Sequence, residues 1–181
     1  MQYDNKNIDL ISSDYLYKGK VLNLRIDKIR TTLKKNIVRE IAEHSPAVAV
    51  VVLNPKNQIC LVSQYRHAIN AKTLEIPAGL VDEGESPLEA AKRELFEETG
   101  IKAINIEKVL SFYTSPGFST ELIHLYYVSD YKATISQNKD DAENISVFWY
   151  SIHDVLEKIK MGSIKDAKTI LACYWYVQKR R

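Results

Sequence analysis

Alternation of apolar and polar side chains predicts that the chain begins with short strands. The segments YLYKGKVLNLRIDKIRTTL (15–33) and NIVREIAEH (36–44) alternate in part, and LKKN at their junction is typical of a hairpin turn. The apolar run AVAVVVLN (47–54) predicts a buried strand, and ICLVSQYR (59–66) predicts another after a polar turn. We place a boundary near residue 45, between N-terminal strands (1–45) and a main domain (46–181).

The rest of the chain mixes strand and helix patterns. Strands are expected near 104–113, 121–128 and 147–151, and helices over 87–99, 153–162 and 166–181. On the last helix, four apolar side chains share one face: Ile170, Leu171, Tyr174 and Val177. Interspersed strands and helices predict an α/β or α+β sandwich around a mixed sheet.

The helix over 87–99 has clear signals at both ends. Ser86 can cap it, Pro87 suits its first position, and Glu89 completes a capping box. Gly100 is a suitable residue to end it. At 100° per residue, three apolar side chains share one face and are expected to pack inward: Leu88, Ala91 and Leu95.

The same helix is crowded with carboxylates. Glu94, Glu97 and Glu98 occupy a sector about 100° wide beside the apolar face. Glu94 and Glu98 lie one turn apart, where like charges repel, and Arg93 can pair with Glu97. Two interpretations follow: a solvated acidic helix surface, or a site for a hard divalent cation, which needs oxygen ligands on a rigid element.

The charge distribution adds weight to the second interpretation. The formal net charge is only +2, which gives no reason to expect binding to nucleic acid or a membrane. Residues 79–101 nevertheless carry a charge of −5, so the other residues sum to +7. An acidic site in a mildly basic body suits a cation beside an anionic substrate, although chance clustering would look the same.

The cysteines and the apolar runs indicate a cellular setting. Cys60 and Cys173 show neither metal-binding spacing nor a disulfide framework, so we expect buried free thiols in a reducing compartment. The N-terminal sequence lacks the pattern of a signal peptide, and AVAVVVL (47–53) is too short to span a bilayer. We therefore expect a cytoplasmic protein.

The segment GLVDEGESPLEAAKRELFEETGI (79–101) resembles the Nudix box, G-x5-E-x7-R-E-U-x-E-E-x-G-U, where U is apolar. Every fixed position matches, including Gly79, Glu85, Arg93 and Gly100. The resemblance implies a Nudix α/β/α sandwich around a mixed sheet, with a small N-terminal antiparallel sheet. It also implies a hydrolase that cleaves a nucleoside diphosphate linked to another group.

The resemblance assigns roles within the box. It implies that Glu94 and Glu98 are the main ligands of Mg²⁺, or alternatively Mn²⁺, with Glu97 close behind. Glu85 would support the site directly or through water, and the carbonyl of Ala78 would be a further candidate ligand. Arg93 would orient a carboxylate through a charge-assisted hydrogen bond, and Gly79 would let the backbone turn into the site.

Other segments are similar to the ADP-ribose pyrophosphatase subgroup. The stretch SFYTSPGFSTELIHLYYV (111–128) carries its S-P-G-x-x-x-E pattern, which makes Pro116, Gly117 and Glu121 candidate substrate contacts. Further similar stretches are KGKVLNL, IVREIAEHSPAVAVV, LVSQYRHAI, LEIPAG and DAKT. The resemblance implies Mg²⁺-dependent hydrolysis of ADP-ribose to AMP and ribose 5-phosphate.

The subgroup also implies a homodimer, in which N-terminal strands are exchanged and substrate binds between subunits. By position, Arg39 would contact the adenosine end and Arg66 a phosphate; the alternative for both is a structural cation. A glutamate in the loop before VFWYS would bind metal or act as a base. Glu143 is the best match and Asp141 its rival, and a solvated loop is the alternative.

Two other functions stay open. One is hydrolysis of a different nucleoside diphosphate sugar or a dinucleotide, such as GDP-mannose or NADH, because related enzymes share much of this frame. The other is a Nudix-like nucleotide sensor without catalysis. Such sensors often lose glutamates of the box, whereas this chain keeps all of them.

Overall fold

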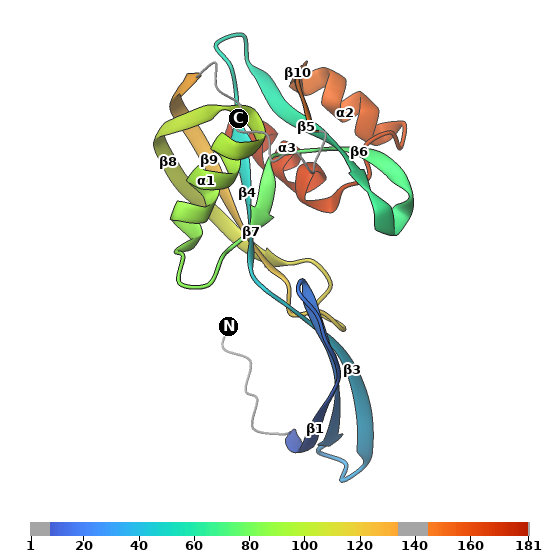
Figure 1. Cartoon of the computed structure of the whole chain (residues 1–181). Coiled ribbons are helices and arrows are strands. Elements are labelled where there is room, and N and C mark those ends of the chain that lie inside the picture. Colours follow the sequence, from blue (N-terminus) through green and yellow to red (C-terminus); the bar gives the residue numbers. More distant parts are fainter. Residues whose placement is uncertain (1–7, 134–144, 181) are drawn as a thin grey trace. The chain divides into compact units, whose positions relative to one another are not determined.

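The computed structural model describes residues 8–133 and 145–180 of the chain (Figure 1). In those residues the strands are β1 (Asp9–Lys18), β2 (Leu22–Arg30), β3 (Asn36–His44), β4 (Ala47–Val52), β5 (Gln58–Arg66), β6 (Ala71–Glu75), β7 (Ala78–Leu80), β8 (Ile101–Tyr113), β9 (Leu122–Ala133) and β10 (Ser146–Ser151). The α-helices are α1 (Pro87–Thr99), α2 (Ile152–Lys160) and α3 (Ala167–Lys179). A short 3-10 helix spans His67–Ile69.

The chain divides into two compact units. The first comprises residues 1–46 together with 113–122, and the second comprises 47–112 and 123–181. In the first unit, β1, β2 and β3 form the antiparallel sheet that the N-terminal alternation predicts. Residues 113–122 join this unit because Ala42 donates from its N–H to the Phe118 carbonyl at 2.8 Å and accepts from the Thr120 N–H at 3.1 Å.

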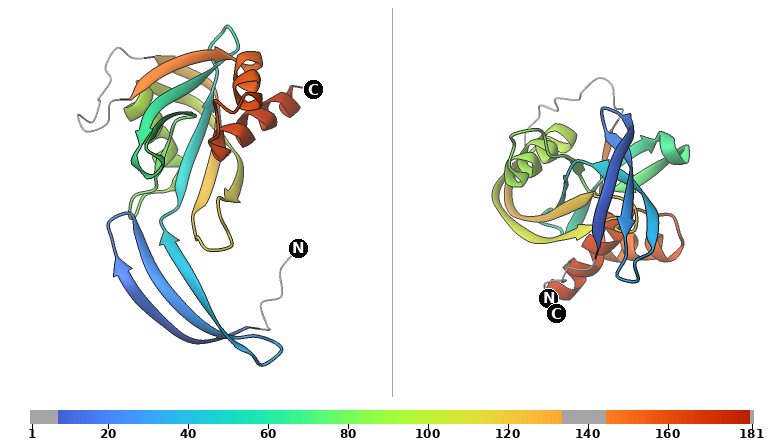
Figure 2. Two further views of the ribbon diagram at one scale, coloured as in Figure 1. Left: turned by 90° about the vertical axis from the view of Figure 1, so that its right-hand side faces the viewer. Right: turned by 90° about the horizontal axis from the view of Figure 1, so that it is seen from below.

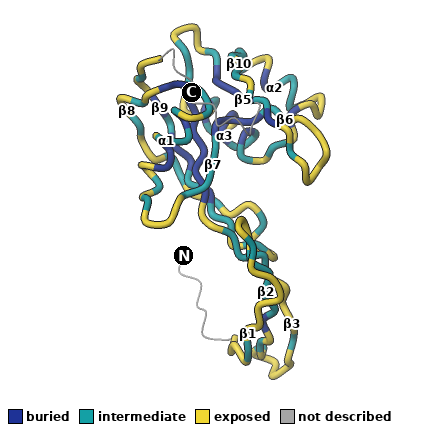
Figure 3. The backbone as a smooth tube through the Cα atoms, viewed as in Figure 1, coloured by how far each residue is buried: buried dark blue, intermediate teal, exposed yellow. Residues whose placement is uncertain are grey.

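The three-stranded sheet of the first unit has little apolar core. Its strands are mostly exposed or half-buried along their length (Figure 3), and Asp27 is the one fully buried residue among β1–β3. Asp27 accepts a hydrogen bond from the Ser13 hydroxyl at 2.7 Å. Several large apolar side chains point to solvent instead: Leu10, Leu16, Tyr17 and Val38.

The second unit contains a mixed sheet with the strand order β7-β4-β9-β8, and a three-stranded sheet with the order β10-β5-β6. Strand β4 runs parallel to β9 and antiparallel to β7, which confirms the predicted mixed sheet. All six residues of β4 are buried, as its continuous apolar pattern predicts.

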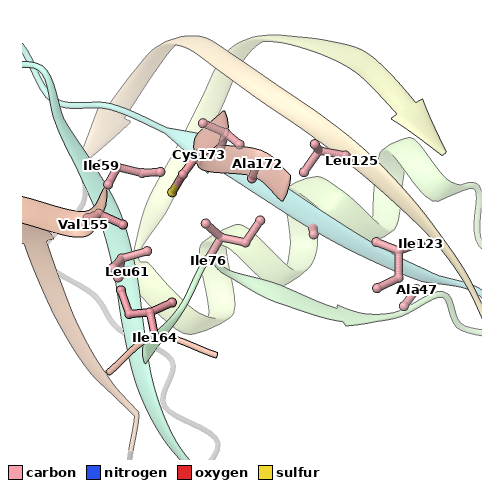
Figure 4. Packing of buried hydrophobic residues seen from close by; sticks show 12 residues of the cluster. Ala47, Ile59, Leu61, Ile76, Ile123, Leu125, Val155, Ile164, Ala172 and Cys173 are labelled. Carbon is pink, nitrogen blue, oxygen red and sulfur yellow. The ribbon is translucent and has the colours of Figure 1, made fainter. Parts of the chain in front are cut away.

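The two faces of β4 pack against different helices. Val48, Val50 and Val52 contact the cluster that contains α1, whereas Ala47, Ala49 and Val51 belong to the cluster that contains α2 and α3. Because successive side chains in a strand point to opposite faces, one strand serves both cores. The result is an α/β/α sandwich, with α1 on one side and α2 and α3 on the other (Figure 2). Figure 4 shows the buried cluster that contains α2 and α3.

Helix α1 begins and ends where the sequence predicts. Ser86 accepts from the Glu89 N–H, the Glu89 carboxylate accepts from the Ser86 N–H at 3.0 Å, and both halves of the capping box are present. Gly100 adopts the left-handed conformation, with φ 73°. The predicted inward face is wrong at Leu88, which is exposed; Ala90 is buried in its place, with Ala91 and Leu95.

Helix α3 also lies in the predicted segment but buries a different face. Tyr174 is exposed, and the buried residues are Thr169, Ala172, Cys173 and Tyr176. Ala172 and Cys173 belong to the buried cluster of the core, against which Ile170 and Trp175 also pack. Cys60 and Cys173 are both buried free thiols, as predicted. In the described part of the chain, no helix has the length and apolarity to cross a membrane.

Candidate active site

Arg93 is the centre of the acidic cluster on α1. Its guanidinium donates to both oxygens of Glu85, at 3.0 and 2.9 Å, and to Glu94 at 2.6 Å and Glu97 at 3.1 Å. A further bond of 2.9 Å reaches the carbonyl of Leu80. The fork of the guanidinium suits this arrangement, because one planar group can serve several carboxylates. Arg93 therefore links the helix to the preceding loop.

Glu94 is held against the backbone of β7. A Cβ atom placed on Gly79 would lie 2.0 Å from the Glu94 Cδ atom and 2.2 Å from each of its oxygens. Gly79 has no positive φ angle. The glycine is therefore required by the close approach of a carboxylate, a reason other than the backbone turn expected from sequence.

Glu98 is the most perturbed carboxylate of the cluster. Burial raises its pKa to about 8, and the nearby charge of Glu94 acts in the same direction. The N–H of Ala78 donates to Glu98 Oε2 at 3.1 Å and partly offsets this effect. Burial also raises the pKa of Glu94, against the opposing effect of Arg93. Perturbed carboxyls of this kind are typical of functional sites.

A second group of charges lies beside Glu98. Arg66, at the end of β5, donates to Glu75 from Nε at 2.8 Å and from Nη2 at 2.7 Å. Lys168 on α3 binds the same carboxylate and also Asp166, at 2.9 Å. Both Arg66 and Lys168 lower the pKa of Glu98 through their charge, which places them within electrostatic reach of it.

Glu75 stays ionised although it is buried. Burial by itself would raise its pKa, but hydrogen bonds from Arg66, Lys168 and Thr73 outweigh that effect and lower the pKa to about 2. Its side chain is 4% exposed, whereas that of Arg66 is 41% exposed. The carboxylate thus anchors the guanidinium of a side chain that is itself partly exposed.

The structure brings the predicted metal-site residues of the box together. Glu85, Glu94 and Glu97 meet at Arg93, and Glu98 meets the backbone at Ala78, through the N–H of that residue. Arg66 lies in the same unit and near Glu98. Glu75 and Lys168 are functional candidates to which the sequence patterns assign no role, although LEIPAG and DAKT contain them.

Other predicted site residues lie on the first unit or outside the described residues. Arg39 is on β3, where its Nη1 donates to the Val38 carbonyl at 3.2 Å. Pro116, Gly117 and Glu121 are in the 113–122 segment. Glu121 accepts from the Thr114 hydroxyl at 2.6 Å and lies 3.8 Å from His44 Nδ1. Glu143 and Asp141 lie outside the described residues.

The donor chemistry of the box fits a hard divalent cation. Carboxylate oxygens are the ligands that Mg²⁺ and Mn²⁺ prefer, and Glu94 and Glu98 lie one helical turn apart. Within residues 8–133 and 145–180, no three acidic, histidine or cysteine side chains are already grouped around one cation position. Mg²⁺ is usually held by one or two carboxylates with waters and substrate phosphates, so a complete protein cage is not needed.

Comparison with known proteins shows which family this chain resembles. A sequence model of the NUDIX domain matches residues 43–173. The methanol dehydrogenase activator of Bacillus methanolicus is 36% identical, and the ADP-ribose pyrophosphatase of Bacillus subtilis is 34% identical; each alignment covers 90% of this chain and 88% of the relative. A GDP-mannose pyrophosphatase of Cronobacter sakazakii is 33% identical over 91% of this chain and 92% of its own.

A solved structure shows the same fold. The crystal structure of an ADP compounds hydrolase superposes with a TM-score of 0.84, at 18% identity, over 98% of this chain and 96% of that one. The family match covers most of the chain and includes all of the acidic helix α1, with Arg93 at the centre of its acidic cluster. The chain belongs to the Nudix hydrolase family.

Proposed function

We propose that this protein hydrolyses the pyrophosphate of ADP-ribose to AMP and ribose 5-phosphate, with Mg²⁺ as cofactor. The supporting observation is the pairing of two groups in one unit: the carboxylates of α1 and, near Glu98, the partly exposed side chain of Arg66. The first group suits a cation and the second suits a phosphate. The ADP-ribose pyrophosphatase of Bacillus subtilis, aligned over 90% of the chain, favours the choice of substrate.

Each residue has a physical task in this proposal. Glu94 and Glu98 would hold the cation, with Glu97 and Glu85 close by. When bound, the cation neutralises the phosphate oxygens and activates a water molecule. Water adds to one phosphorus as the bond from that phosphorus to the bridging oxygen breaks. The hydroxyl of the water stays on the attacked phosphate, and the proton goes to the other product.

The chain's own residues bind and orient the reactants. Arg66 would bind a phosphate through its guanidinium, which belongs to a partly exposed side chain that Glu75 holds in place. Arg93 keeps Glu94 against Gly79, so that its carboxylate is oriented before a ligand arrives. We assign the general base to Glu143, with Asp141 as its rival and a glutamate of the box as the third candidate; Glu143 and Asp141 lie outside the described residues. E143Q and D141N separate them, since the variant that lacks the base should lose the larger part of kcat.

Substrate panels test the proposal. Wild-type protein is incubated with ADP-ribose, GDP-mannose, NADH and other nucleoside diphosphate sugars, and the phosphomonoester products are converted by a phosphatase to measurable phosphate. We expect ADP-ribose to give the highest kcat/KM and turnover to require Mg²⁺. A preference for GDP-mannose would overturn the substrate assignment, in line with the Cronobacter sakazakii relative. Nucleotide binding without turnover of any compound would indicate a sensor.

The Glu98→Gln variant tests the site itself. It should lose nearly all turnover while keeping the fold, because an amide is a much weaker ligand for Mg²⁺ than a carboxylate. Glu83→Gln is the matched control, since Glu83 is an exposed acid of the same box. Parental activity in Glu98→Gln would show that the metal assignment is wrong.

We further propose that residues 1–45 form a dimerisation sheet. The large apolar side chains exposed on β1–β3 would gain a covered environment in a homodimer. Sedimentation equilibrium should give twice the chain mass of 20.7 kDa. Replacing Leu16 and Val38 with lysine should give a monomer, whereas a monomeric wild type would refute the proposal.

The two buried free thiols fit a cytoplasmic setting.

A further inference from the structure

An ion cluster joins the start of α3 to the ends of β5 and β6. Arg66 and Lys168 bind the carboxylate of Glu75 together, and Lys168 also binds Asp166. Two cations and two anions make the cluster neutral. Its members differ in exposure, however: the side chains of Glu75, Lys168 and Asp166 are 4%, 12% and 18% exposed, whereas that of Arg66 is 41% exposed.

The geometry around Glu75 fixes the orientation of Arg66. Nε and Nη2 form two parallel bonds, one to each oxygen of the carboxylate. Such a bidentate pair defines the plane of the guanidinium as well as its position. The carboxylate must itself be held in place for this to work, and Lys168 Nζ binds Oε2, the same oxygen that receives Nη2. Thr73 supplies a hydroxyl bond to the other oxygen.

Helix α3 is anchored by contacts other than those of Lys168. Asp166 caps the helix by accepting from the Thr169 N–H at 3.0 Å. Thr169, which is buried, accepts from the N–H of Ile76 at 2.8 Å and so ties α3 to the residue after β6. Ala172 and Cys173 pack in the core below. These contacts hold the helix through groups other than the half-buried Lys168, whose bond to Glu75 is therefore free to serve a different task.

We propose that Lys168 is a positioning residue for hydrolysis: it holds the Glu75 carboxylate, which in turn fixes the Arg66 guanidinium to receive a substrate phosphate. This inference rests on the proposed function, because it assumes that Arg66 binds a phosphate. Without Lys168 the Glu75 carboxylate would lose one bond at Oε2, so it would be held less firmly and the guanidinium paired with it would be less well placed for a phosphate.

The test is a double-mutant cycle with Arg66→Ala and Lys168→Met. Activity is measured on whichever panel compound the wild type hydrolyses fastest, so the result does not depend on ADP-ribose being the substrate. Lys168→Met alone should lower kcat/KM by about 10- to 100-fold, the usual effect of removing a group that orients a ligand. In the Arg66→Ala background the same change should cost less than about threefold, because contacts that act through one residue are not additive.

Three controls make the outcome decisive. Lys165→Met removes a charge from an exposed site on the same segment and should leave kcat/KM unchanged. Lys168→Arg keeps the charge and should recover most of the activity. Lys168→Gln serves if Lys168→Met does not fold.

Equal losses of kcat/KM from Lys168→Met in the wild-type and Arg66→Ala backgrounds would overturn the proposal. A failure of both Lys168→Met and Lys168→Gln to fold would overturn it too, because Lys168 would then be needed for the fold. Wild-type protein that hydrolyses no panel compound would refute the proposed function, and with it the proposed role of Lys168, in a measurement made before any variant is studied.

Discussion

Ionised Glu98 opposes folding of the metal-free protein, so its replacement should stabilise that state. Burial raises the pKa of Glu98 from 4.5 to about 8. Below pH 4.5 the carboxyl is protonated in both the folded and the unfolded chain. Between pH 4.5 and 8 the folded state keeps the proton while the unfolded state releases it, so the free energy of unfolding falls as pH rises. Above pH 8 the whole cost is present.

The size of the effect follows from the two pKa values. At about 1.4 kcal/mol for each tenfold change in proton affinity, the difference between 4.5 and 8 corresponds to about 5 kcal/mol. Solvent relaxation around the site makes this an upper bound, and about 2–3 kcal/mol is a reasonable expectation. Glu98→Gln cannot ionise, so it should be more stable than the wild type by this amount at pH 8.5, and the two should converge near pH 4.5.

Urea denaturation in the presence of a chelator measures this difference. Glu83→Gln is the control, because it removes a charge from an exposed position of the same box and should leave the free energy of unfolding almost unchanged. Addition of Mg²⁺ should reverse the order, since binding stabilises the wild type and not Glu98→Gln. Equal stabilities at pH 8.5 without metal would refute the reasoning from burial.

Three further changes probe the same unit. Gly79→Ala should lower the melting temperature by several degrees in a thermal scan, since its Cβ would overlap the Glu94 carboxylate, whereas Gly117→Ala meets no atom within 4 Å and should not. Arg93→Met should cost about 2–3 kcal/mol in urea unfolding by releasing charge-assisted bonds. Because Glu75 has a pKa lowered to about 2, the stability advantage of the wild type over Glu75→Gln should shrink as pH falls from 4.5 to 2, which acid titration followed by circular dichroism can detect.

Local signals predicted α1 well. The capping box at Ser86 and the glycine at position 100 act through bonds between residues a few positions apart, so their spacing alone determines where the helix starts and stops. The buried strand β4 was equally clear, because a strand covered on both faces needs apolar residues throughout. The glutamates of the Nudix box were likewise recognisable from their spacing within one segment, 79–101.

Contacts between distant segments could not be predicted in the same way. Lys168 and Glu75 are 93 residues apart, and their pairing depends on where α3 docks. The apolar face of α3 did not indicate which residues are buried: Tyr174 is exposed, whereas Ala172, Cys173 and Tyr176 are buried. Periodicity identifies an amphipathic helix, but close packing of particular shapes decides which side is buried.

Repulsion between like charges is not the main electrostatic cost of the crowded carboxylates on α1. Arg93 binds Glu94 and Glu97 on the helix, together with Glu85, so the mutual repulsion of these carboxylates is largely offset before any cation arrives. The larger cost falls on Glu98, and its first cause is burial. A buried carboxylate gains most from a positive charge that replaces lost solvation. Cation binding at this helix should therefore depend more on Glu98 than on Glu97, whose side chain is 47% exposed. Calorimetry should accordingly show a greater loss of Mg²⁺ affinity in Glu98→Gln than in Glu97→Gln.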